Sequence, residues 1–239
     1  MRPAEAGHRV GRMSWFVMIY WLHIAAGALA FAVVSIPLLA RKGGRAHVRF
    51  GRVYVYAMAA LAVTGVPLAA RGLAHEDPVR RANALFLFFI ALLAADSAWM
   101  GVGVLRAAKG SPAARGGPAR IGPPAVLLLA ALGLLVLGIL GRSVLHVSFA
   151  LLGVTLATGR LAFWRRFTRT RADAIVMHIG AMGVSCITTL TAFVITNARH
   201  FFHARPFTLA LWIAPTVLGT AAIGLSQRAW RARLTRGEP

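Results

Sequence analysis

Long apolar runs constrain this chain more than any other feature of its sequence. Runs of about 18 residues or more, which is the length a helix needs to cross a bilayer, recur from end to end. Of its 239 residues, 58% are hydrophobic and only 14% are charged. Soluble domains carry nearer 25% charged residues, so lipid is the expected solvent of this fold. The sequence therefore predicts an all-α integral membrane bundle in a multi-pass protein.

Seven spans are predicted, with short polar connections between them. They cover residues 14–40, 50–70, 82–105, 123–140, 144–163, 172–198 and 207–226. We expect one transmembrane domain over residues 14–226, with basic tails at 1–13 and 227–239. The first span is too long for a signal-peptide core, and no small-residue cleavage pattern follows it. The least supported connection is Gly141-Arg142-Ser143, and losing the span after it would move every later connection to the other side.

The charges predict how the helices are oriented. Lys and Arg number 27 against 6 Asp and Glu, and no motif resembles a nucleic-acid-binding fold, so we expect no nucleic acid partner. With seven spans, two thirds of these cations fall beside the first, third and fifth connections and the C-terminus. Cytoplasmic connections collect Lys and Arg, so the N-terminus is expected outside and the C-terminus in the cytoplasm. The expected location is a bacterial inner membrane.

The connection at residues 41–52 is the most polar stretch between two spans. Gly43-Gly44 predicts a tight turn, and Gly51 predicts a close approach of the second span to a neighbour. The cations either mark the topology or bind anionic lipid headgroups or a phosphate at the cytoplasmic face; they include Lys42, Arg45, Arg49 and Arg52. A turn needs no imidazole, so His47 has no such simple explanation.

Polar residues inside the spans are the candidates for function. Asp96 is the only carboxylate well inside a span, where a partner or a neutral state is expected. A stripe on the sixth span has helical spacing and comprises His178, Ser185, Thr189 and Thr196. The stripe would line a path for a proton, ion or cofactor, or would form hydrogen bonds between helices. His23, with Gly27 one turn later, marks either a ligand or a close helix contact.

Depth in the membrane sorts the histidines into two sets. The outer set is His23 and His146, joined in outer connections by His75, His200 and His203. The inner set is His47 and His178. Haem b needs two imidazoles at matched depth, so His23 with His146 and His47 with His178 are the candidate axial pairs. A single haem or a transition-metal site is open as well. The lone Cys186 excludes a disulfide within the chain and a Cys-based metal site.

Three function classes follow from these residues. The first is electron transfer by b-type haem or a metal bound to intramembrane histidines. The second is a proton-coupled transporter or channel that uses Asp96 and His178 as relay groups. The third is an intramembrane metal-dependent hydrolase, in which histidines and Asp96 hold zinc. No motif points to serine or cysteine catalysis.

One set of motifs resembles an uncharacterised family of bacterial multi-pass membrane proteins, domain of unknown function 2306. The residues that carry the resemblance are His23, Gly27, Lys42-Gly43-Gly44, His47, Gly51-Arg52-Val53-Tyr54, Met58, His178, Thr191-Ala192-Phe193, Asn197 and Trp212-Ile213-Ala214-Pro215-Thr216. The resemblance runs from about His23 to Ser226, and its most specific part is residues 42–54. It implies a fold and a topology but no reaction. Relatives often carry an acid near the end of the fifth span, where this chain has Gly159-Arg160.

Overall fold

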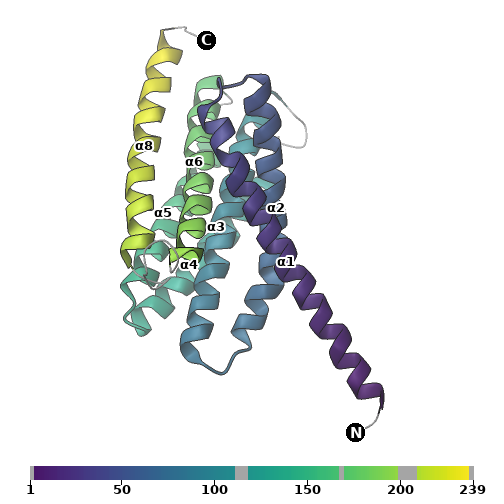
Figure 1. The fold of residues 1–239 in the computed structure, drawn as a ribbon. Helices are drawn as coiled ribbons and strands as arrows, with labels where there is room; N and C mark the ends of the chain where they lie inside the picture. The colour runs from purple at the N-terminus through teal and green to yellow at the C-terminus, as the bar shows by residue number, and fades with distance from the viewer. Residues whose placement is uncertain (1–2, 111–117, 167–169, 199–208, 237–239) are drawn as a thin grey trace. The chain divides into compact units, whose positions relative to one another are not determined.

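The computed structural model describes residues 3–110, 118–166, 170–198 and 209–236, and the regular elements among them are all α-helices (Figure 1). The helices are α1 (Pro3–Leu39), α2 (Arg45–Leu73), α3 (Pro78–Ala108), α4 (Pro118–Leu140), α5 (Val144–Arg166), α6 (Arg171–Thr196) and α8 (Leu209–Thr235). Within these described residues, seven helices are long and apolar enough to cross a membrane, as the sequence predicts. A helix satisfies its own backbone donors and acceptors where lipid offers none.

Several helices extend beyond the apolar runs that predict them. α2 begins at Arg45 rather than at residue 50, and α8 continues through residues 227–235. Arg and Lys are good helix formers, so a change from apolar to basic sequence does not end a helix. The prediction that residues 45–52 belong to a connection is therefore wrong. His47 and the arginines of this stretch lie on the first turns of α2.

Two of the expected turns are present. Gly43 has φ +76°, in the left-handed region that glycine reaches without strain, and Gly44 directly precedes α2. Between α4 and α5, the Ser143 N–H donates to the Gly138 carbonyl at 2.8 Å, which closes a tight turn after α4. The connection at residues 141–143 is therefore confirmed, and with it the separate fifth helix.

Two local expectations are wrong. No described atom lies within 4 Å of the position that a Cβ would occupy at Gly51, so this glycine does not mark a close approach. Pro123 and Pro124 lie inside α4 rather than at its start, because the helix already begins at Pro118. Both prolines therefore remove backbone donors from a helix interior.

The chain divides into two compact units, residues 1–91 and residues 92–239. In the first unit, α1 and α2 pack as an antiparallel hairpin, with Arg71 over the Phe16 ring at 5.0 Å and His23 beside Thr64. The start of α3 approaches α2 closely, since a Cβ at Gly72 would lie 2.5 Å from the Ala84 Cβ. The buried side chains of this unit include Val34, Tyr54, Met58, Phe86 and Phe89.

The second unit holds the rest of α3, the α4–α5 hairpin and the α6–α8 pair (Figure 1). α6 and α8 run antiparallel and touch through glycines, because a Cβ at Gly180 would lie 2.6 Å from Gln227 and one at Gly183 would lie 2.5 Å from Ile223. Such small residues allow the close helix contacts that stabilise bundles in lipid. The expectation of one domain over residues 14–226 stays a prediction.

Candidate functional site

A buried ion pair joins α3 and α5 inside the second unit. Asp96 is 5% exposed and Arg160 is 4% exposed, and Arg160 Nη1 donates to Asp96 Oδ2. The second guanidinium nitrogen, Nη2, donates to Ser97 Oγ at 2.7 Å. Ser97 Oγ in turn donates to the Leu93 carbonyl at 2.6 Å. One arginine thus binds two consecutive residues of α3. Both helices, α3 and α5, are otherwise largely apolar.

One turn before Arg160 on α5 lies a small buried residue, Ala157. The expectation that Asp96 has a partner is confirmed, and the partner is Arg160.

Arg160 is a candidate site residue that the sequence did not predict. The orientation count includes it among the cations beside the fifth connection, although it lies inside the predicted span 144–163. It is also the only Lys or Arg in that span, and this signal could have identified it. A cation and a carboxylate within spans of one bundle are expected to pair, because each is expensive to leave alone in lipid.

His178 lies one turn along α3 from the ion pair. Its Nδ1 donates to the Gly101 carbonyl at 2.8 Å, and Gly101 is four residues after Ser97 on the same face of α3. α6 comes this close because Gly101 has no side chain, since a Cβ there would lie 2.7 Å from Met182 Sδ. The His178 contact at Gly101 therefore lies about 6 Å along α3 from the Arg160 contact at Ser97.

Ser185 and Thr189, two further residues of the predicted stripe on α6, are buried. Thr189 Oγ1 donates to the Ser185 carbonyl at 3.1 Å, within the same helix. The side chain of Thr196 lies outside the described part of the chain. The role of the stripe, as a path lining or as a contact between helices, therefore stays a prediction.

The other candidate histidines make local contacts within their own units. His23 Nδ1 lies 2.9 Å from Thr64 Oγ1, and this hydroxyl donates to the Ala60 carbonyl, so the imidazole is the donor to Thr64. The ring lies beside Gly65, at a distance where a Cβ would make an ordinary contact with His23 Cε1, at 3.7 Å. His146 Nδ1 is bonded to Ser143 Oγ at the start of α5. Both rings therefore fix contacts between neighbouring helices or turns.

His47 and Lys42 fasten the α1–α2 turn. The imidazole Nδ1 of His47 donates to the Pro37 carbonyl at 2.9 Å, and Lys42 Nζ donates to the same carbonyl at 2.9 Å. Lys42 also reaches the Leu38 carbonyl. The last carbonyls of a helix lack partners within it, so these two side chains complete the end of α1. The hydrogen bond to the Pro37 carbonyl gives a reason for an imidazole at position 47, which the turn alone did not explain.

The haem and metal hypotheses gain no support from these contacts. Among the described residues, no three His, Cys, Asp or Glu side chains are grouped in a way that could hold a metal ion. Each candidate axial pair has one histidine in the first unit and one in the second. The pairings His23–His146 and His47–His178 therefore stay predictions. His75 is exposed, and its Nδ1 accepts a hydrogen bond from the Asp77 N–H at 3.1 Å in its own turn. His200 and His203 lie outside the described residues.

Comparisons with known protein families, with curated proteins and with solved structures gave no match. Membership of the family that the motifs resemble therefore stays a prediction. The motif residues Tyr54, Met58 and Trp212 are buried, which is consistent with a role in packing.

Proposed function

We propose that this chain is a multi-pass protein of a bacterial inner membrane that couples the movement of a proton to that of an anion. The observation that carries the proposal is the buried network of Asp96, Arg160 and Ser97. A buried ion pair is weak support for stability, because a well-packed hydrophobic pair of similar volume is often as stable. Ionisable residues inside spans mark functional sites by default.

The mechanism follows from the different chemistry of the two charged groups. A guanidinium group stays charged in proteins, whereas a carboxylate accepts a proton. Protonation of Asp96 removes the negative charge and leaves Arg160 without a counter-charge in a low-dielectric site. An anion that reaches Arg160 restores neutrality, since planar guanidinium groups bind carboxylate and phosphate oxygens with two parallel hydrogen bonds. Proton and anion therefore enter the site together and leave together.

His178 is the proposed proton relay. With the N-terminus outside and the C-terminus in the cytoplasm, this residue lies on the cytoplasmic side of Asp96. Imidazole exchanges protons near neutral pH, so it suits a stepwise path between the carboxylate and the cytoplasm. Gly101 holds the ring beside α3 through its carbonyl, one turn from Ser97.

Proton flux into proteoliposomes tests the proposal. An acid-outside pH gradient is applied with chloride, phosphate or succinate outside, and a trapped dye reports the internal pH. We expect one of these anions to accelerate acidification by the wild-type protein, and Asp96→Asn to abolish the acceleration. Glu76→Gln is the matched control, since it also removes one carboxylate, from an exposed connection. An Asp96→Asn variant that keeps the wild-type rate would contradict the proposal.

A further inference from the structure

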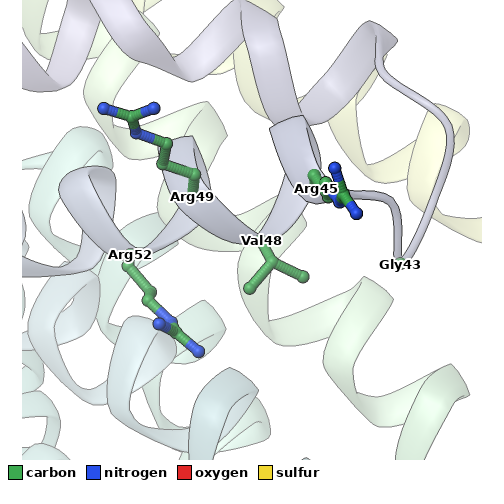
Figure 2. Close-up of a pocket in the computed structure, with 5 residues that line it drawn as sticks. All are labelled: Gly43, Arg45, Val48, Arg49 and Arg52. Atoms are coloured by element: carbon green, nitrogen blue, oxygen red, sulfur yellow. The ribbon is translucent and has the colours of Figure 1, made fainter.

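An open hollow on the first turns of α2 carries three arginines. It has a volume of about 510 Å³ and is lined by Gly43, Arg45, Val48, Arg49 and Arg52. Positions 45, 49 and 52 are four and three residues apart, so the arginines share one face of the helix. Figure 2 shows Val48 between Arg45 and Arg52, with the three guanidinium groups extended from the helix.

The three arginines are not neutralised within the described part of the first unit. None of their guanidinium groups makes a hydrogen bond or an ion pair with a described residue of that unit, and the first turn of α2 contains no acidic residue. Lys42, the fourth cation of the predicted set, differs from them because its ammonium group binds carbonyls at the end of α1. Of the four predicted cations, Lys42 therefore stabilises the turn. The three arginines are exposed on the surface.

Apolar side chains adjoin this basic surface. Val48 is 40% exposed inside the hollow, and Leu39, at the end of α1 just before the turn, is 87% exposed. The apolar stretch of α2 that is long enough to span a membrane begins at the same arginines. A soluble phosphate would contact the cations only. A phospholipid matches both features, because its phosphate meets the arginines and its acyl chains meet the apolar side chains.

We infer that this hollow binds the headgroup of an anionic phospholipid of the cytoplasmic leaflet. The phosphate oxygens accept hydrogen bonds from Arg45, Arg49 and Arg52, whose guanidinium forks match phosphate geometry better than an ammonium group does. Val48 contacts the first carbons of the lipid. Charge complementarity selects the headgroup, since basic residues next to a span bind anionic lipids. This inference does not depend on transport by the Asp96–Arg160 pair.

Native mass spectrometry of the purified full chain tests the inference. Phosphatidylglycerol and phosphatidylcholine with identical acyl chains are titrated into separate detergent samples, and retained lipid is measured. The test variant carries Arg45→Gln, Arg49→Gln and Arg52→Gln. The control variant carries Arg106→Gln, Arg228→Gln and Arg231→Gln, which removes the same charge from exposed positions at other helix ends. A third arm adds inorganic phosphate in large excess.

The wild-type protein and the control variant should retain one phosphatidylglycerol in preference to phosphatidylcholine. The test variant should bind phosphatidylglycerol on the order of 100-fold more weakly, at about fivefold for each cation removed. Equal retention of the two lipids would overturn the inference, as would equal losses in the two variants. Complete displacement of the lipid by inorganic phosphate would assign the hollow to a soluble anion instead. An unchanged melting temperature of the test variant shows that a loss of binding is not a loss of folding.

Discussion

At the scale of single residues, mutation can separate the stability of the Asp96–Arg160 pair from its function. Arg160→Met leaves a carboxylate buried without its counter-charge, and breaking a buried pair in this way costs about 3–5 kcal/mol. Replacing both residues, as Asp96→Leu with Arg160→Met, leaves no charge to solvate. We expect the apparent melting temperature in detergent to fall for the single variant and to return to the wild-type value or above for the double variant.

The double variant also tests whether the pair is there for transport. A protein that folds with wild-type stability but no longer couples protons to anions would show that the charges serve transport. If the single variant Arg160→Met has the same melting temperature as the wild-type protein, the ion pair itself is contradicted.

The sequence predicted one half of this site. Asp96 stands out because it is alone among apolar residues, so the need for a partner follows from the energy of a charge in lipid. The partner could not be deduced with the same certainty, because spacing along a helix does not say which neighbouring helix it faces. Arg160 was misassigned because cations near helix ends usually mark the cytoplasmic side.

At the scale of helices, the α6–α8 contact depends on glycines that admit large side chains from the other helix. A methyl group at Gly183 would lie 2.5 Å from Ile223 Cγ1. We expect Gly183→Ala to destabilise the protein by about 1–3 kcal/mol, as overpacking of a tight interface does. Adding Ile223→Ala should recover part of this loss. Thermal unfolding of the purified variants gives the comparison.

Gly224 on α8 supplies the matched control for this prediction. No described atom lies within 4 Å of the position of its missing Cβ. Gly224→Ala should therefore be neutral, or should stabilise the helix by about 0.5–1 kcal/mol through the lower conformational entropy of alanine when unfolded. Equal losses for Gly183→Ala and Gly224→Ala would mean that the loss at Gly183 does not arise from the contact with Ile223.

The α1–α2 turn offers a second prediction at this scale. His47→Ala removes one hydrogen bond to the Pro37 carbonyl and leaves Lys42 as its remaining side-chain donor among those described. A bond of this kind is worth about 0.5–1.5 kcal/mol. Backbone amide exchange at the last turn of α1 should therefore become up to about tenfold faster, while exchange in α6 stays unchanged. Unaltered exchange near residue 40 would show that Lys42 alone holds the turn.

Helices were predicted far better than their ends. Apolar length decides that a helix forms in lipid, and this property can be counted along the chain. The ends depend on which residues break a helix, and basic residues do not. α2 therefore begins at Arg45, directly after Gly43 and Gly44, and α8 runs on to Thr235.

At the scale of the whole molecule, the orientation in the membrane rests on the distribution of cations. Burial of Arg160 removes one cation from the cytoplasmic count, and the remaining ones still favour the same side by a wide margin. The tight turn at residues 141–143 supports the alternation on which this count depends. The expected orientation is therefore unchanged: N-terminus outside and C-terminus in the cytoplasm.

Cysteine labelling in intact cells tests this orientation. Cys186 is first replaced by alanine, and single cysteines are then introduced as Glu76→Cys, between α2 and α3, or as Lys109→Cys, after α3. A membrane-impermeant maleimide should label position 76 from outside, because it lies in a connection on the predicted outer side, and should label position 109 only after the cells are broken. Both positions are exposed, so burial does not explain a difference between them. The reverse pattern would invert every depth assigned here. It would then place the hollow formed by Arg45, Arg49 and Arg52 on the outer face and not at the cytoplasmic leaflet that it is inferred to bind.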